Sequence, residues 1–467
     1  MIPGGLPYTE GGSSPSTSSP PARHHLKLPS RDFNPYRGPA TERAGAWVLG
    51  VALQVEKLGE RQRKRKRKDQ AAFEAVSRAL LSDLALNALR AGGGVEAPFL
   101  RVFTGHRKPS RYAPSWTFGM AFLGVLKGLE ELGLVEFHRG GWTPEDGKHG
   151  GAVRGTGFLM ESLRGAGLEV EDFRADLAGY EPVRLKTANV RGERGRKSKG
   201  ELIDYRETRD TRRWREELAR ANRYLEGLSL SCALGSYLLG DAGEEGCSSS
   251  SSTPPARLVA VDPLDRAVHR IWNNGTWKDG GRLYGGFWLG MPKEVRRKHL
   301  RIGGSPVAHC DFGQLFVRLA YALQGEEPPG GDLYALPGWE NARGPVKTFF
   351  TASFFERGRP EALPQGARAG LPEELVKATG GDLMKALKER HPALAPLLGT
   401  NIGFKLLGVE GEVMLMTLGL AEEAGLSVLP VHDCCLCPRP EAEAVKGVME
   451  NAFRSVTGGK GCPVTVT

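Results

Sequence analysis

PVAHCDFGQLFVRLAYAL (Pro306–Leu323) joins a short apolar run to a longer apolar segment through one aspartate, Asp311. The run before Asp311 predicts a buried strand, and LFVRLAYAL after it predicts an apolar helix. A second stretch, LSVLPVHD (Leu426–Asp433), predicts another buried strand with an aspartate near its tip. Two strands that each deliver one carboxylate are the minimum platform for two divalent cations about 3.5–4 Å apart. Mg²⁺ needs few protein carboxylates when substrate phosphates complete its coordination.

The chain between the two aspartates supplies cations of the kind that a triphosphate needs. In RGPVKTFFTASFFERG (Arg343–Gly358), Arg343 and Lys347 are four residues apart and share one face of a helix. Neighbouring aromatic side chains could support a base, namely Phe350, Phe354 and Phe355. The alternative is a surface Arg/Lys pair on a helix that packs through its phenylalanines. Taken alone, this segment favours the alternative.

Several motifs, in the same order, resemble those of family A DNA polymerases. DFGQLFVR resembles motif A through Asp311, Phe312, Gly313, Gln314 and Arg318. The segment that begins at Arg343 resembles motif B through Arg343, Lys347 and Phe355, and PVHDCC resembles motif C through His432 and Asp433. Two flanking segments, GGRLYGGFW and GGDLYAL, match through Arg282 and Asp332. The resemblance extends from Gly280 to the end of the chain.

The resemblance implies an α+β fold with a right-hand polymerase palm and fingers at the C-terminus, after a mainly helical, winged-helix-like region. It implies DNA synthesis from dNTPs on a template or primer, with two Mg²⁺ or Mn²⁺ ions bound by Asp311, Asp433 and the Phe312 carbonyl. The residues expected to bind the nucleotide are Arg343, Lys347, Phe355, Gln314 and Phe316. Those expected to contact template or primer are Arg282, Arg318 and His432.

Departures from the family pattern leave alternatives open. Phe316 and Cys434 stand where motifs A and C usually carry glutamate, and Thr351 and Glu356 depart from motif B. No convincing 3′–5′ exonuclease motif precedes them. Phage-type single-subunit RNA polymerases belong to the same superfamily and also tolerate V-H-D without glutamate, so an RNA product or a primase is a second reading. A non-catalytic, DNA-binding replication initiator with a palm remnant is a third.

Composition indicates a chain that binds a polyanion. The chain has 467 residues, a formal net charge of +10 and a pI near 9.2, which favour nucleic acid first and an acidic membrane surface second. It has no apolar run of about 18 residues and no secretory signal. Seven cysteines without such a signal predict reduced thiols in the cytoplasm. Cys434, Cys435 and Cys437 lack a second close ligand pair, so burial is favoured over structural zinc.

Changes in composition along the chain predict its organisation. Residues 1–42 are rich in Pro, Gly and Ser and are expected to be a disordered tail. A basic helical segment follows at 43–97, and its run RQRKRKRK (Arg61–Lys68) is either a phosphate contact or a solvated face. Residues 98–180 predict a winged-helix-like nucleic-acid-binding domain, or a small helical domain without that role. A basic helical connector or thumb-like region is expected at 181–239, a low-complexity linker at 240–257, and the palm and fingers at 258–467.

Overall fold

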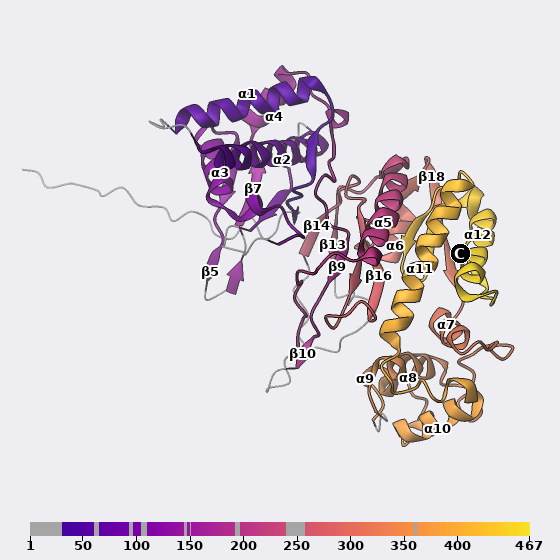
Figure 1. The fold of residues 1–467 in the computed structure, drawn as a ribbon. Helices are drawn as coiled ribbons and strands as arrows, with labels where there is room; N and C mark the ends of the chain where they lie inside the picture. Colours follow the sequence, from indigo (N-terminus) through magenta and orange to yellow (C-terminus); the bar gives the residue numbers. More distant parts are fainter. Residues whose placement is uncertain are drawn as a thin grey trace, which may run out of the picture.

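The computed structural model describes residues 30–59, 65–92, 97–103, 110–143, 147–149, 151–191, 197–239, 257–358 and 362–467. These residues form a mixed α+β structure with an N-terminal and a C-terminal unit (Figure 1). Each unit has its own core of buried apolar side chains. The α+β class expected from the sequence is therefore confirmed.

A six-stranded sheet and four helices make up most of the N-terminal unit. The sheet has the order β13-β14-β1-β3-β7-β4, and β1 runs parallel to both β3 and β14. Its strands are β1 (Ser30–Asp32), β3 (Phe99–Val102), β4 (Val135–His138), β7 (Gly151–Gly155), β13 (Ser236–Leu239) and β14 (Arg257–Ala260). The helices are α1 (Glu42–Leu58), α2 (Arg67–Ala91), α3 (Met120–Glu131) and α4 (Gly157–Gly165). Short pairs complete the unit: β2 (Arg37–Pro39) with β8 (Phe173–Ala175), and β5 (Gly141–Thr143) with β6 (Gly147–His149).

The N-terminal unit has one continuous core, so the predicted boundary between residues 97 and 98 does not exist. Leu84 of α2, Leu126 of α3 and Val153 of β7 are fully buried in the same apolar cluster as α1. The expected succession of a helix and a hairpin within 98–180 is present, because α3 is followed by the antiparallel pair β4–β7. The nucleic-acid-binding role of this segment stays a prediction.

The predicted disorder of residues 1–42 is wrong for its last part. Residues 30–42 form β1, β2 and the start of α1, where the Thr41 side chain accepts a hydrogen bond from the N–H of Ala44. Arg31 and Arg37 anchor this segment through buried ion pairs with Asp83 and Asp262. These partners lie about 50 and 225 residues away, so local composition could not reveal them. Residues 1–29 lie outside the described part.

A second sheet forms the centre of the C-terminal unit. Its order is β12-β17-β18-β20-β19, and β21 pairs with the remaining edge of β18. The strands are β12 (Leu230–Cys232), β17 (Leu300–Ile302), β18 (Ser305–Phe312), β19 (Leu429–Val431), β20 (Cys434–Pro438) and β21 (Val464–Val466). A smaller sheet beside it has the order β16-β15-β9, with β9 (Val183–Leu185), β15 (Val268–Trp272) and β16 (Gly280–Gly285).

Helices pack around and beyond these two sheets. The long helix α11 extends from α12 down to the distal helices α8 and α9, as Figure 1 shows at the lower right. The helices are α5 (Arg209–Gly227), α6 (Lys293–His299), α7 (Leu315–Leu323), α8 (Arg343–Phe355), α9 (Gln365–Ala369), α10 (Gly380–Arg390), α11 (Gly403–Glu423) and α12 (Ala442–Thr457). Short 3₁₀ turns occur at Ser115–Phe118, Val170–Asp172, Glu373–Leu375, Pro392–Leu394 and Arg439–Glu441.

The C-terminal unit begins near residue 181, not at 258 as predicted. Trp214 of α5 stacks on Trp272 of β15 with ring centroids 4.3 Å apart, and β9 pairs with β15. Val183 and Leu218 are fully buried in the core that contains β18 and β20. Residues 181–232 are thus part of this unit and not a separate connector, while β13 joins the N-terminal sheet. The predicted linker lies almost wholly in 240–256, outside the described residues.

Two predicted features fall partly or wholly beyond the described ranges. Of the basic run Arg61–Lys68, residues 61–64 lie outside, and α2 begins at Arg67. Arg65 forms an ion pair with Glu56 and lies over the Phe73 ring, so this cation is not simply a solvated charge. The described helices include none that is both long and apolar enough to cross a membrane.

Candidate active site

Asp311 lies near the end of the central strand of the C-terminal sheet. Strand β18 pairs with β20 on one side and with β21 on the other, where Asp311 is opposite Cys434 and Thr465 respectively. Pairing on both edges holds the Asp311 backbone in place. The strand that was expected to end at Asp311 is therefore present, with one further residue, Phe312.

Asp433 lies in the two-residue turn that joins β19 to β20. Val431 and Cys434 pair across this turn, and His432 has a positive φ of 55°. A positive φ at the first turn residue suits a tight hairpin whose twist matches that of its strands. The Phe312 N–H donates a hydrogen bond to the Asp433 carbonyl at 3.0 Å. This bond ties the turn to the end of β18, so both predicted carboxylates arise from the same end of one strand pair.

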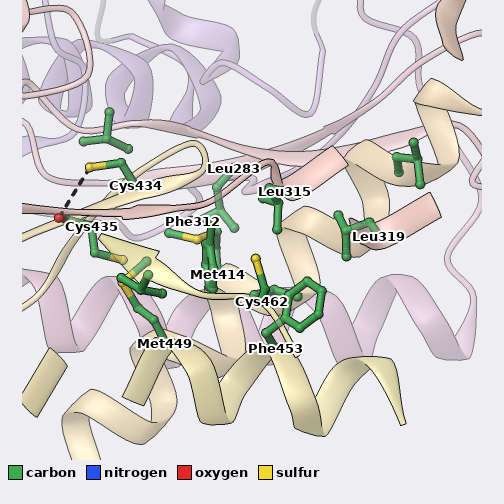
Figure 2. Close-up of a cluster of buried hydrophobic side chains, with 14 of the residues drawn as sticks. Leu283, Phe312, Leu315, Leu319, Met414, Cys434, Cys435, Met449, Phe453 and Cys462 are labelled. Carbon is green, nitrogen blue, oxygen red and sulfur yellow. Dashed lines mark hydrogen bonds between the residues drawn. The ribbon is translucent and has the colours of Figure 1, made fainter. Parts of the chain in front are cut away.

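Successive residues of β20 point to opposite faces of the sheet, as a strand requires. Figure 2 shows Cys435 directed toward Met449, while Cys434 lies on the other side of the strand. Cys435 and Cys437 are fully buried, which agrees with the packing role expected from the sequence. Cys434 is also buried, but it faces the side of the sheet that carries Asp311, and its sulfur lies within 4.8 Å of the Asp311 carboxylate. Cys434 is therefore more than a packing residue.

The carboxyl group of Asp433 is held in an unfavourable electrostatic environment. Burial raises its pKa above the ordinary value, and the nearby charge of Asp311 raises it further. Arg282 and Lys347 act in the opposite direction but do not offset burial. The Asp433 side chain is nevertheless exposed at the tip of the turn, so water weakens these effects. A cation that bound between the two aspartates would relieve this repulsion.

Arg282 of β16 does not point freely toward a ligand. It forms two hydrogen bonds, of 2.8 and 2.7 Å, with the carboxylate of Glu410, which is fully buried on α11. Burial raises the pKa of Glu410, while Arg282 lowers it. Gly411 makes this pairing feasible, because a Cβ there would lie 2.1 Å from the Gly281 carbonyl oxygen. Arg282 is thus bound to Glu410 within the protein and is not an unpaired cation for template or primer.

A chain of three hydrogen-bonded side chains connects the segment after β18 to α8. Gln314, with a φ of 58°, precedes α7 and donates its side-chain amide to Asp332. Asp332 also accepts from the guanidinium of Arg343, which lies over the Tyr334 ring. The Arg343 side chain is still 57% exposed. Gln314 therefore positions Asp332 and Arg343 in this structure, while Arg343 keeps a solvent-facing surface.

The predicted nucleotide face of α8 is the face that the core leaves uncovered. Arg343 and Lys347 are exposed and Phe355 is half-buried, whereas Val346, Phe350 and Phe354 are fully buried. Of the three phenylalanines expected to be able to support a base, Phe355 is thus the accessible one. Phe350 and Phe354 belong to the core and cannot support a base.

An aromatic group connects the end of α8 to α7 and α11. The Phe355 ring lies 6.0 Å from that of Phe316 and 5.7 Å from that of Phe404. The guanidinium carbon of Arg282 also lies over the Phe316 ring, 6.0 Å from the ring centroid. Gly403 permits this packing, since a Cβ there would lie 2.6 Å from the Phe355 ring. Phe316 is half-buried between the aspartate-bearing sheet and α8, and is not enclosed in the core of its own helix.

The two remaining predicted residues flank the carboxylates. His432 packs edge-on against Tyr284 of β16, with ring centroids 6.0 Å apart. Burial, together with the charges of Arg282 and Arg296, lowers the pKa of His432 to about 3, so the ring is neutral at pH 7. Arg318 donates its Nε–H to the Gly313 carbonyl and supports the turn after β18. A phosphate contact through a charged His432 is therefore disfavoured.

Two sets of metal donors share Asp311. Toward the turn, the Asp311 and Asp433 carboxylates supply hard oxygen donors, which fit Mg²⁺ or Mn²⁺. On the same face of the sheet, the Asp311 carboxylate lies within 4.8 Å of a ring nitrogen of His309, also on β18, and of the sulfur of Cys434, on β20. The participation of the Phe312 carbonyl stays a prediction. In their donor chemistry, Asp311 and Asp433 thus fit two divalent cations, with the minimum number of protein carboxylates.

Sequence reasoning missed Glu410 and His309. Glu410 lies between Gly408 and Gly411 among the apolar positions of the helix, and an acidic residue there indicates a cationic partner, because an unpaired buried charge is costly. His309 lies two residues before Asp311, so period-two alternation already placed both on one face. His309 becomes a candidate metal ligand only because Cys434 lies beside it, and this proximity follows from the pairing of β18 with β20.

Comparison of the chain with protein-family models and with curated proteins found no match.

Proposed function

We propose that this protein is a template-directed nucleotidyltransferase that makes DNA from dNTPs. One observation carries the proposal: the backbone hydrogen bond from Phe312 to Asp433 holds the two aspartates at the same end of one strand pair. Opposite them, α8 exposes Arg343 and Lys347. Phosphoryl transfer asks a protein mainly for metals, cations and in-line positioning, and this arrangement provides residues for each.

Each group has a distinct role in this proposal. Asp311 and Asp433 would hold two Mg²⁺ ions, which neutralise charge on the phosphates and lower the pKa of the attacking hydroxyl. Arg343 and Lys347 bind the triphosphate, and the Asp332 carboxylate orients Arg343. Phe355 lies where it can support the new base pair. Arg282, fixed by Glu410, partly offsets the negative charge around the carboxylates.

The N-terminal unit is proposed to hold the nucleic acid. Its helix α3 and hairpin β4–β7 occur in the order expected of a recognition helix and wing. The chain's net charge of +10 supports contact with phosphates. In this view the protein is a small replicase or primase-polymerase, of the kind that a plasmid, phage or other mobile element would need.

Primer extension tests the proposal directly. Purified full-length protein is incubated with Mg²⁺ or Mn²⁺, a labelled primer on a longer template, and either dNTPs or NTPs. We expect template-length products with dNTPs and none with Asp433→Asn. Asp210→Asn, a carboxylate-to-amide change at an exposed site on α5, is the matched control and should extend normally.

A parallel reaction without primer separates the polymerase from a primase. Products that form only with NTPs would replace DNA synthesis by RNA synthesis as the function. No incorporation under any of these conditions, or full extension by Asp433→Asn, would overturn the proposal.

A further inference from the structure

His309, Asp311 and Cys434 form a second potential metal site, beside the carboxylate pair. Their ligand atoms all lie within 4.8 Å of one another. His309 and Asp311 are two residues apart on β18, so both project from one face, and Cys434 of β20 is directly opposite Asp311. His309 and Cys434 are only 1% and 5% exposed, whereas Asp311 is half-buried and leaves a route from solvent.

The contacts within this cluster are weak in the metal-free protein. The Cys434 Sγ lies 3.8 Å from His309 Nδ1 and 3.5 Å from the carbonyl oxygen of Cys435, the contact drawn as a dashed line in Figure 2. The other imidazole nitrogen of His309, Nε2, is buried without a hydrogen-bond partner among the described residues. Since Nδ1 is the nitrogen that faces Cys434, Nδ1 would be the metal ligand and Nε2 would carry the ring proton.

The donor set selects a class of ion. Nitrogen, oxygen and sulfur ligands together suit Zn²⁺ and similar thiophilic cations, whereas Mg²⁺ takes oxygen ligands. Three protein ligands with one open position is the usual arrangement of a reactive zinc site. Bonds of about 2.0–2.3 Å imply ligand atoms about 3.3–3.8 Å apart in a tetrahedron. The largest distance between two ligand atoms, at most 4.8 Å, would thus shorten by about 1 Å. Side-chain rotation can supply this change.

We propose that Zn²⁺ binds His309, Asp311 and Cys434 and thereby withdraws Asp311 from the catalytic pair. The thiol proton leaves as the sulfur binds, because the thiolate is the ligand. The binding itself stands on this cluster alone, while its inhibitory effect rests on the proposed function. The sulfur of Cys434 is the donor that makes this cluster select a different metal from the carboxylate pair.

Metal binding is tested without any activity assay. Co²⁺ is titrated into the metal-free full-length protein, and the thiolate-to-cobalt charge-transfer band is recorded and then displaced by Zn²⁺. We expect one ion per chain, and at least tenfold weaker binding without the band in Cys434→Ser and in His309→Gln. Cys435→Ser, one residue away on the opposite face, is the matched control and should keep the band.

The wild type provides a second measurement that needs no variant to fold. X-ray absorption at the zinc edge should find one sulfur and one imidazole nitrogen around the ion. A sulfur-free shell, no band in the wild type, or a band that survives Cys434→Ser would each overturn the site.

Inhibition is then measured by primer extension at saturating Mg²⁺, as the ratio of rates with and without Zn²⁺. We expect a rate at least tenfold lower in the wild type with stoichiometric Zn²⁺, and a ratio near one in Cys434→Ser. If Zn²⁺ binds through the cluster and leaves the rate unchanged, the regulatory role fails. Should the protein show no extension at all, the proposed function fails while the binding result still decides the site.

Discussion

Asp83 and Asp262 in the N-terminal part of the molecule contrast with Asp311 and Asp433 in the C-terminal unit. Arg31 lies 2.8 Å from Asp83, Arg37 lies 2.7 Å from Asp262, and Arg90 also pairs with Asp262. Burial alone would raise the pKa of Asp262, but Arg37, Arg31 and Arg90 outweigh it and the pKa is lowered. Asp433 shows the opposite balance, because burial and Asp311 prevail over Arg282 and Lys347.

The difference separates carboxylates that protein cations neutralise from carboxylates that they do not. The buried network around Asp262 is satisfied by protein cations and connects residues 31–37, α2 and the segment after β14. Within the described residues, neither Asp311 nor Asp433 has an ion-pair partner within 4.0 Å. Arg282 has the largest favourable charge interaction with Asp433, but its guanidinium is already bound to Glu410. A carboxylate pair left without a protein cation is a pair that a metal can neutralise.

The largest effect should come from the reactive pair. Asp311→Asn and Asp433→Asn should each lower the rate of primer extension by several orders of magnitude, because a carboxamide cannot replace a metal-binding carboxylate. Two residues that act through one metal centre are not additive, so the double variant should be little worse than either single one. Single-turnover extension rates measure this. Additive losses would mean that the two aspartates act independently.

Loss of stability should come from the structural set instead. Asp262→Asn leaves Arg37 and Arg90 without their buried partner, and breaking a buried ion pair costs about 3–5 kcal/mol. Chemical denaturation should show this loss in the transition of the N-terminal unit. Asp433→Asn, the same change at the other site, should leave the free energy of unfolding unchanged or slightly higher. Equal losses at both positions would remove the distinction.

A more moderate effect is expected at Phe316, which lies between Arg282 and Phe355. A phenyl ring beside the sugar clashes with a 2′-hydroxyl and cannot hydrogen-bond it. An unpaired hydroxyl costs about 1–3 kcal/mol, which corresponds to about 5- to 150-fold preference for the deoxynucleotide. Phe316→Ala should therefore reduce the ratio of kcat/KM for dATP over ATP. A wild type that already prefers ATP, or an unchanged ratio, would exclude Phe316 as the gate.

The smallest effect is a pH dependence of stability with opposite signs at the two sites. The Asp262 pKa is lowered by folding, so its contribution to stability is present above about pH 3.9 and is lost as the pH falls below that value. The Asp433 pKa is raised, so ionisation above about pH 3.9 should destabilise the metal-free wild type relative to Asp433→Asn. Urea denaturation between pH 2 and pH 7 measures both, the Asp262 loss below about pH 3.9 and the Asp433 penalty above it.

Added Mg²⁺ should remove the Asp433 penalty. The ion binds the charged carboxylates, so it should raise the stability of the wild type and leave that of Asp433→Asn nearly unchanged. An equal shift in both proteins would place the stabilising ion elsewhere.

Local periodicity was enough to predict several parts of the site. Alternating and apolar runs identified the strands that carry Asp311 and Asp433, because burial of a strand leaves a direct pattern in the sequence. Spacing by four predicted the exposed face of α8 with Arg343 and Lys347. Those features depend on periods of 2 and 3.6 residues, which a single segment contains in full.

Only the tertiary structure decided which distant side chains meet. Arg282 and Glu410 are 128 residues apart, and Cys434 lies 125 residues from His309. Arg37 is held by Asp262 across 225 residues, which orders a segment whose composition predicted disorder. The order of the strands and the close approach of α11 to Gly281 create these contacts. Periodicity states which face of an element is buried, whereas the partner across that face is set by topology, which no local pattern encodes.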